Sequence, residues 1–387
     1  MVTWQERRMP SNKLGMMGAS GSAGGGGYEL YGWGQGTNGK TAQGSTLAYS
    51  VPNQVGTESD WATISIERSS GLGVKTDGTL WSWGNNATGQ LGHGDIIKRS
   101  SPTQVGSLKD WAFVAASRQE NGHCGAIKTD GTLWMWGQST FGVLGDGTTI
   151  NKSSPVQVGT DTDWARVVCG HDSNTFAIKT TGTLWGWGRD DYGALGNNAD
   201  GATSGRSAPL QIGTDDYWSE VVAPNTLCGM ALRTDGTLWS WGYQLYGNGG
   251  LGNVINRSSP TQVGSLTDWA AIASGNGSSL ATKTDGTLWS WGNGGNGATG
   301  QGDTISRSSP TQIGSLTYWE TTQKAIGITQ QGMAIKTDGT LWSWGGNYSG
   351  ALGNASTVHA SSPVQVGTDT TWVEVGAPVN AGMALKS

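Results

Sequence analysis

Charged side chains are scarce in this sequence: they make up 13% of its 387 residues, about half the usual share. The net charge is −5, so the chain lacks the basic surface that a general nucleic-acid binder needs. No apolar run approaches the roughly 20 residues of a membrane helix, and residues 14–27 are too glycine-rich for the apolar part of a signal peptide. We therefore expect neither nucleic-acid binding nor membrane insertion.

Cysteine and histidine are also rare, with three and four residues. Cys124, Cys169 and Cys228 occur at unrelated places, so buried free thiols are a better interpretation than a disulfide framework. His123-Cys124 and Cys169 with His171 indicate a zinc site only weakly, because the two pairs have different offsets within the repeat described below. No nucleophile–base pair emerges. We expect no enzyme activity, no cofactor and no metal.

Glycine and tryptophan are abundant instead, with 66 and 21 residues, and many belong to an internal repeat. The decapeptide KTDGTLWSWG at residues 75–84 recurs five times with few changes, and a partial copy occupies residues 29–34. Two further markers each occur seven times, at a spacing of about 52 residues. They are a lone Trp (Trp61, Trp111, Trp164, Trp218, Trp269, Trp319 and Trp372) and a Pro (Pro52, Pro102, Pro155, Pro209, Pro260, Pro310 and Pro363).

Each repeat has the pattern of a small antiparallel sheet. Asp77-Gly78 is a hairpin turn signal between the strands 72–75 and 79–83. We expect residues 61–66 and 52–55 to supply the other two strands. Because side chains alternate along a strand, the Trp side chains share one face and can pack on the small residues of the next sheet. Seven such sheets predict an all-β, seven-bladed propeller over residues 28–387.

The two ends of the chain complement each other. The chain stops after residues 383–387, which match the strand that precedes the hairpin turn in the other repeats. The missing WxWG strand is found only at residues 29–34. We therefore predict that the last blade takes two strands from each terminus, which removes the exposed sheet edges of an open array.

The repeat KTDGTLWSWG, followed by NNATGQLG at residues 85–92, resembles that of the regulator of chromosome condensation family. The resemblance covers residues 28–387 and implies a seven-bladed propeller. The relatives include an exchange factor, a photoreceptor and a β-lactamase inhibitor protein, so the resemblance implies protein binding rather than catalysis.

Length variation between the repeats points to a binding face. The spacing from the lone Trp to the next Lys or Arg varies from 14 to 17 residues, and one WxWG-to-Pro connection is three residues longer than the others. Both connections should lie on one rim of the ring, and insertions on one face often mark a binding surface; drift in unconstrained loops is the alternative. The candidate contact residues are Arg118, Glu120, Asn121, His123, His171, Asp172, Asn174, Asp200, Arg206, Asn225, Lys324, Gln330 and Gln331.

Residues 1–27 match no part of the repeat and form a separate N-terminal arm. Residues 18–27 are mostly Gly, Ser and Ala, which is typical of a flexible hinge. A disordered tail is the simple interpretation. We expect instead a docking segment with the apolar anchors Trp4, Met16 and Met17 and the basic residues Arg7 and Arg8.

The sequence favours a non-enzymatic structural or binding protein. The start GGYELYGWG and the near-identical repeats resemble virion proteins of marine bacteriophages, which implies a tail, fibre or capsid-associated component located in the virion. Its partners would be other virion proteins, a host surface protein or a glycan. The alternative is a bacterial protein-binding module or inhibitor with the same propeller.

Overall fold

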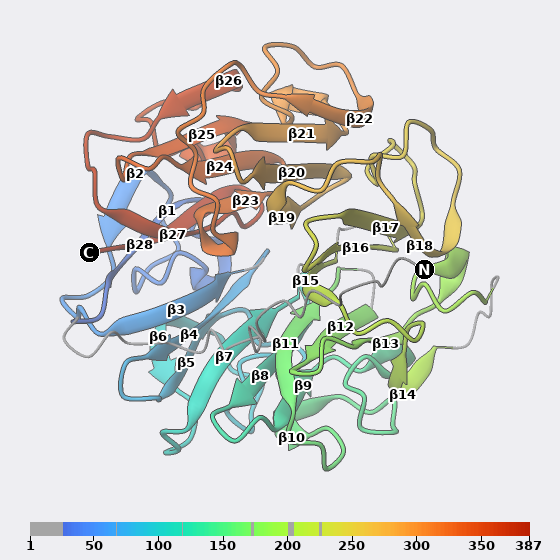
Figure 1. The fold of residues 1–387 in the computed structure, drawn as a ribbon. Helices are drawn as coiled ribbons and strands as arrows, with labels where there is room; N and C mark the ends of the chain where they lie inside the picture. The colour runs from blue at the N-terminus through green and yellow to red at the C-terminus, as the bar shows by residue number, and fades with distance from the viewer. Residues whose placement is uncertain (1–25, 67, 118, 172–173, 200–204, 224–226) are drawn as a thin grey trace, which may run out of the picture.

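The computed structural model describes residues 26–66, 68–117, 119–171, 174–199, 205–223 and 227–387. These residues form seven four-stranded antiparallel sheets, arranged as blades around a central axis (Figure 1). The expected seven-bladed propeller is therefore confirmed. We number the blades 1 to 7 from the one that begins at Trp61, so that blade 7 contains both chain ends.

The strands of a blade run outward from the axis in the order in which the chain visits them, except in blade 7. The innermost strands are β3 (Trp61–Ile66), β7 (Trp111–Ala116), β11 (Trp164–Cys169), β15 (Trp218–Val222), β19 (Trp269–Ser274), β23 (Ile326–Ile328) and β27 (Trp372–Gly376). The second strands are β4 (Ser70–Lys75), β8 (His123–Lys128), β12 (Asn174–Lys179), β16 (Cys228–Arg233), β20 (Ser278–Lys283), β24 (Gln331–Ile335) and β28 (Ala381–Lys386).

The WxWG segments form the third strands and the proline segments the outermost ones. The third strands are β5 (Leu80–Gly84), β9 (Leu133–Gly137), β13 (Leu184–Gly188), β17 (Leu238–Gly242), β21 (Leu288–Gly292), β25 (Leu341–Gly345) and β1 (Glu29–Gly34). The outermost strands are β6 (Arg99–Gln104), β10 (Lys152–Gln157), β14 (Arg206–Gln211), β18 (Arg257–Gln262), β22 (Arg307–Gln312), β26 (Ala360–Gln365) and β2 (Tyr49–Gln54).

The place of the proline strand corrects one expectation. Residues 52–55 do not belong to the blade of Trp61; they lie in β2, which pairs with β1 in blade 7. In the same way Pro102 lies in β6, which pairs with β5 through Trp81 opposite Gln104. Proline has no N–H to donate, so an outermost strand tolerates it where an inner strand would not.

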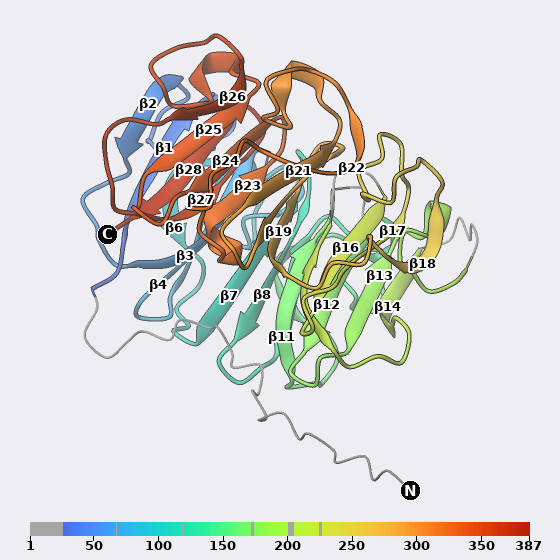
Figure 2. The ribbon, with the colours of Figure 1, turned by 45° about the horizontal axis from the view of Figure 1, so that its top comes forward.

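The closing blade combines both termini, as predicted. Its strand order is β2-β1-β28-β27, so two strands come from each end of the chain. The register between β1 and β28 is continuous from Glu29 opposite Lys386 to Gly34 opposite Ala381. The blue strands β1 and β2 lie beside the red strands β27 and β28 (Figure 2). The ring consequently has no open sheet edge between its first and last strands.

Tryptophan side chains join neighbouring blades. Trp83 and Trp61 of blade 1 pack against Leu30, Met383 and Leu385 of blade 7, and every other blade interface repeats this pattern of large on small side chains. The indole N–H of the second Trp in each WxWG motif donates to a backbone carbonyl in a loop of the preceding blade, at 2.7 to 3.2 Å. One of these bonds, from Trp33 to Ala351, crosses the closure.

The ring has two unlike faces. The lower face carries the tight turns between the second and third strands and the connections that lead to the next blade. In blade 1 the backbone N–H of Thr76 donates to Asp60 O, which ties these two connections together. The upper rim carries the loops after the first and third strands, and the N–H of Asn85 donates to Ser69 O across them. The long loop between β7 and β8 therefore lies on the upper rim, as expected, whereas the extra residues of blade 6 lie near the axis.

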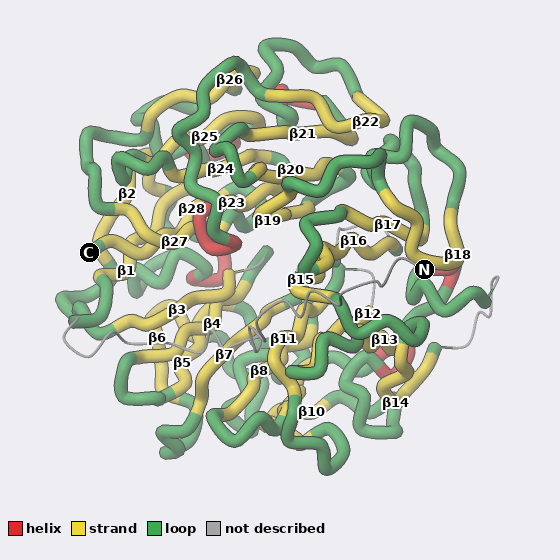
Figure 3. Tube along the Cα trace, viewed as in Figure 1, coloured by secondary structure: helices red, strands yellow, loops and turns green. Residues whose placement is uncertain are grey.

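Short 3-10 helices occur on the upper rim in five of the loops after the third strand. These are η1 (Thr37–Gly39), η2 (Thr140–Gly142), η3 (Asp191–Gly193), η4 (Gly295–Gly297) and η6 (Tyr348–Gly350). The sixth, η5 (Gln323–Ala325), belongs to blade 6 and lies near the axis between β19 of blade 5 and β27 of blade 7 (Figure 3). No helix in the described part of the chain has the length and apolar character that a membrane crossing requires.

Candidate functional site

The upper rim contains some of the predicted contact residues in exposed positions. Glu120 and Asn121 are exposed, as is Arg206 at the start of β14. His171 and Gln330 are partly buried. Arg118, Asp172, Asp200 and Asn225 lie outside the described residues, as do Trp4, Arg7, Arg8, Met16 and Met17 of the arm.

The long loop between β7 and β8 packs against blade 1 through hydrogen bonds. The carbonyl oxygen of Glu120 accepts hydrogen bonds from the side chains of Ser69, Asn85 and Gln90, at 2.8, 2.8 and 3.1 Å. Asn121 accepts a further bond from Asn85, at 3.1 Å. The backbone is thus fixed while the Glu120 carboxylate remains exposed. This arrangement suits a preformed contact surface.

Three of the predicted contact residues are buried, so the prediction is wrong for them. His123 is 1% exposed and its Nε2 lies 2.9 Å from Thr175 Oγ1 of blade 3; burial lowers the pKa of its imidazole to about 3. Asn174 is 1% exposed, and Gln331 is fully buried and donates to Ala381 O of blade 7 at 2.7 Å. His123 and Gln331 thus connect blades, and all three side chains are buried at the start of the second strands instead of facing a partner.

Lys324 occupies a different place from the one expected. The extra residues of blade 6 do not lengthen a rim loop; they form η5 within the innermost strand segment, after an isolated bridge at Trp319. Lys324 therefore reaches into the central cavity, where its Nζ lies 3.1 Å from Glu374 Oε2. In blade 6, 17 residues separate Trp319 from Lys336, whereas blades 1, 5 and 7 use 14; blade 2 has the same excess but carries it in its rim loop.

The central cavity has a volume of about 480 Å³ and is lined by residues of all seven blades: the inner strands of six blades, and Thr322 with η5 in blade 6. Two ion pairs cross its wall: Lys324 with Glu374, and Arg166 with Glu220 at 3.6 Å. Burial raises the pKa of Glu220, and the Arg166 guanidinium opposes that rise. Glu374 also accepts hydrogen bonds from Thr63 Oγ1 and the N–H of Ile64. Each charged group on this wall thus has a partner within the protein.

The upper rim also presents a set of exposed aliphatic residues that the sequence analysis missed. Each lies five residues before the repeated Pro and is 61–73% exposed. The six residues, named here the aliphatic crown, are Leu47, Ile97, Ile150, Ile255, Ile305 and Val358. Blade 3 has Ser204 at this position, outside the described residues. Aligning the repeats on Pro would have shown this pattern.

Every crown residue is held by the same local hydrogen bond. Its backbone N–H donates to a side-chain oxygen two residues earlier, at 2.9 to 3.4 Å. The acceptor is Asp, Asn, Ser or Thr, which are the residues that form Asx and ST turns. The crown side chains are therefore presented on fixed turns, so that less conformational entropy is lost when a partner covers them.

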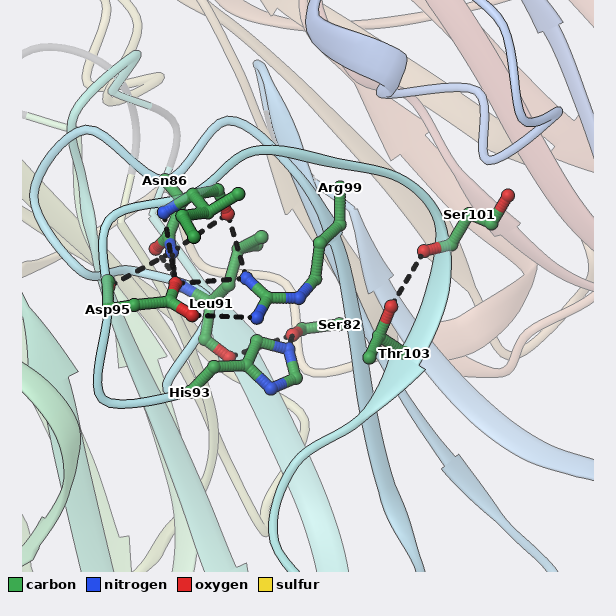
Figure 4. A network of polar contacts seen from close by, with 9 residues as sticks. Ser82, Asn86, Leu91, His93, Asp95, Arg99, Ser101 and Thr103 are labelled. Carbon is green, nitrogen blue, oxygen red and sulfur yellow. Dashed lines mark hydrogen bonds and ion pairs between the residues drawn. The ribbon is translucent and has the colours of Figure 1, made fainter.

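The loop of blade 1 shows how such a turn is fixed (Figure 4). Asp95 forms a bidentate ion pair with Arg99, with N–O distances of 3.1 and 2.9 Å, and these hydrogen bonds hold the pKa of its carboxyl well below the usual range. Arg99 also donates to Ile97 O at 2.7 Å. Asn86 donates to Asp95 O and Ile97 O, both at 3.1 Å, and accepts from the N–H of Leu91. Asp303, Ile305 and Arg307 repeat the ion pair and its carbonyl contact in blade 5.

Aromatic residues add to the upper rim. Tyr192 is 55% exposed and lies next to Tyr243, with ring centroids 5.0 Å apart. Tyr246 is 42% exposed, and the Arg189 guanidinium lies 5.2 Å from the Phe141 ring centroid.

Lys40 of blade 7 is a buried basic residue near the same rim. Its amine donates a hydrogen bond to Val379 O at 2.8 Å, and burial lowers the pKa of this amine to about 8.

The described residues contain no set of side chains arranged as metal ligands. No group of three His, Cys, Asp or Glu side chains is arranged there to hold an ion. Cys124 and Cys169 are both buried, and they belong to separate clusters of apolar residues between blades 1 and 2 and between blades 2 and 3. The weak zinc pattern of the sequence therefore has no counterpart in the geometry of these residues.

These blades, closed by strands from both termini, define a propeller of the chromosome-condensation regulator type. The model for the "Regulator of chromosome condensation (RCC1) repeat" matches residues 77–119, 130–177, 235–282, 285–327 and 338–384, more than half of the chain. The chain belongs to this family.

Known proteins with similar sequences cover only part of this chain. The ultraviolet-B receptor UVR8 of Arabidopsis thaliana is 32% identical over 146 residues, which are 36% of this chain and 32% of the receptor. The human E3 ubiquitin-protein ligase HERC2 is 28% identical over 163 residues, 40% of this chain but 3% of that protein. The chain thus spans a third or less of these two relatives.

Among solved structures, yeast Prp20p from Saccharomyces cerevisiae superposes with a TM-score of 0.80 at 18% identity, covering 93% of this chain and 92% of that one. It was described together with its binding properties to Gsp1p and histones. At this identity the likeness shows the fold alone.

Proposed function

We propose that this chain is a non-enzymatic protein-binding module, and that the upper rim is its binding face. The aliphatic crown is the observation that carries the proposal: six side chains at one repeat position, each at least 61% exposed and each on a hydrogen-bonded turn. Single exposed apolar residues are ordinary on protein surfaces, but the same position in six blades makes a ring of them. The binding of proteins by yeast Prp20p supports such a role for a propeller of this shape.

The chemistry of the rim favours a protein partner over a glycan. The crown offers apolar side chains without hydrogen-bonding groups, and apolar anchors inside a polar rim are typical of protein interfaces. Glu120, Asn121 and Arg206 supply polar contacts around the crown. A glycan would instead use the exposed rings of Tyr192 and Tyr246.

A photo-crosslinking amino acid placed on each face tests this proposal. We expect a crosslinker at Ile97 or Ile305 to capture a partner protein from the native source. The matched controls are Leu108 and Leu266, which are 49% and 43% exposed on the lower face. Equal capture from both faces, or capture from the lower face alone, would show that the upper rim is not the binding face.

We further propose that the partner is a component of a bacteriophage particle, and that the chain is located there. The support is in the sequence: near-identical repeats and the start GGYELYGWG, which resembles virion proteins of marine bacteriophages. Mass spectrometry of purified particles and of the culture supernatant distinguishes this place from that of a bacterial binding module or inhibitor. Peptides of this chain should be enriched in particles; enrichment in the supernatant would favour the bacterial module.

A further inference from the structure

A basic residue ends the second strand of six blades and directly follows that strand in blade 6, next to the lower face, and six of these seven residues have a carboxylate partner from the same chain. The lysine pairs have N–O distances of 2.5 to 3.4 Å. The pairs are Lys75 with Glu58 and Asp60, Lys128 with Asp110, Lys179 with Asp161 and Asp163, Arg233 with Asp215, Lys283 with Asp268, and Lys386 with Asp369.

Lys336 of blade 6 is the exception. The partner carboxylates lie one or three residues before the lone Trp, and in blade 6 these positions hold Tyr318 and Leu316. No carboxylate of the described chain lies within ion-pair distance of Lys336 Nζ. Asp338 attracts this amine, but its Oδ1 accepts hydrogen bonds from the N–H and Oγ1 of Thr340 in the turn.

The groove over Lys336 has no acidic residue in its lining. Lys336 lines a cavity of about 310 Å³ together with Leu316, Trp319, Trp342 and residues of blade 5. The equivalent cavity in blade 1, of about 330 Å³, has Glu58 at the position of Leu316, and Lys75 is buried behind that carboxylate. The groove of blade 6 is thus the same interblade groove without its acidic residue.

The aromatic wall does not replace the carboxylate. Lys336 Nζ lies 3.7 Å from the Trp342 ring centroid and 5.2 Å from that of Trp319. Lys75 makes the same contacts with Trp81 and Trp61, at 4.3 and 5.2 Å, and still has two carboxylate partners. Burial lowers the pKa of Lys336, whereas the pKa of Lys179 is raised, against the effect of burial, by the hydrogen bonds that its amine donates to Asp161 and Asp163.

We propose that the groove over Lys336 binds an acidic side chain of a partner peptide, which supplies the carboxylate that the other six blades take from their own chain. The amine provides a charge-assisted hydrogen bond, stronger than a neutral one. Leu316, which is 41% exposed, lines the groove and favours an apolar residue beside the acidic one. The amine and Leu316 lie at the lower end of the groove, away from the aliphatic crown on the upper rim, so the two sites are separate.

Two tyrosines at one repeat position provide a matched pair of variants. Tyr318→Asp restores the aspartate that pairs with Lys128 and Lys283 in blades 2 and 5, so it should fill the groove from within. Tyr217→Asp makes the same change in blade 4, where Arg233 already has Asp215 and Tyr217 is 59% exposed. Lys336→Gln removes the amine and provides an independent loss of the site.

The test selects heptapeptides from a random display library on the full chain and measures their affinities by calorimetry. We expect peptides with Asp or Glu beside an apolar residue. Tyr318→Asp and Lys336→Gln should weaken their binding at least tenfold, as should changing the peptide's acid to its amide, while Tyr217→Asp stays within twofold of the parent chain.

Selected peptides without acidic residues, or unchanged binding by Tyr318→Asp and Lys336→Gln, would overturn the proposal. Propionate is the probe for a small carboxylate: binding as tight as that of the peptide would show that the groove takes a free carboxylate and not a peptide. Crosslinking from Ile97 reports separately on the upper rim, so failure of one proposal is distinguishable from failure of the other.

Discussion

The tryptophans of a repeat, three in blades 1 to 6 and two in blade 7, differ in what their indole N–H does. The first Trp of the WxWG motif donates to a threonine in its own turn, as Trp81 does to Thr79 Oγ1 at 2.8 Å. The second donates to the preceding blade, as Trp136 does to Gln90 O at 2.9 Å. The lone Trp is buried, and in all seven blades its N–H has no hydrogen-bond partner in the described structure. The same side chain therefore serves in one place for packing and in another for packing plus a bond between blades.

This difference predicts unequal costs for one substitution. Trp111→Phe and Trp136→Phe both remove buried ring volume, but only Trp136→Phe leaves a buried carbonyl, that of Gln90, without its donor. An unsatisfied buried polar group costs about 1–3 kcal/mol. We expect Trp136→Phe to lower the free energy of unfolding in urea by about that much more than Trp111→Phe. Equal costs would mean that the indole bond adds nothing to packing.

At the scale of elements, the turn between the second and third strands repeats one hydrogen-bond chain. Asp77 Oδ1 accepts from the N–H and Oγ1 of Thr79 at 3.0 and 2.6 Å, and Thr79 Oγ1 accepts from Trp81. These bonds from Thr79 lower the pKa of Asp77 to about 2. Blade 3 departs from the pattern, because Thr181 takes the place of the aspartate.

We therefore expect Thr181→Asp to stabilise the protein. Restoring a repeated turn residue should add about 0.5–2 kcal/mol at pH 7, measured by urea unfolding. Because the carboxylate of such a turn has a pKa below its unfolded value of 3.8, the gain should be present above pH 4 and lost as the pH falls toward 2. A gain that persists at pH 2, or a loss of stability at pH 7, would contradict this account of the turn.

The sequence predicts the blades well and the site only partly. Trp61, Trp81 and the Asp77-Gly78 turn recur with fixed spacing, so the fold and its closure follow from local patterns. His123 is buried because the start of its strand packs against the next blade, and Lys324 enters the central cavity because of an insertion in blade 6. Both depend on contacts between blades, which the pattern of a single repeat does not predict.

At the scale of the whole molecule, closure depends on β28. This strand pairs with β1 on one side and β27 on the other, and its Met383 and Leu385 are fully buried against blade 1. Removing it would expose two sheet edges and a face of the neighbouring blade. The contact between the two ends of the chain therefore stabilises the whole ring.

Deletion of residues 383–387 should accordingly destabilise the whole ring. We expect a loss of several kcal/mol, because buried backbone groups lose their partners and two large apolar side chains are removed. Deleting Ser387 alone is the control, since it lies outside β28. A truncated chain that melts within a degree or two of the full chain would show that two-ended closure does not stabilise the ring.

The affinity of crown variants for the captured partner tests the central claim most directly. Ile97→Ser with Ile305→Ser changes the upper rim, and Leu108→Ser with Leu266→Ser changes the lower face to a comparable extent. Because contact residues at the centre of an interface contribute about 1–2 kcal/mol or more each, the upper-rim variant should bind at least tenfold more weakly. The lower-face variant should bind like the parent chain, with both variants melting at its temperature. Equal affinities for the two variants, or a loss confined to the lower-face variant, would contradict the account.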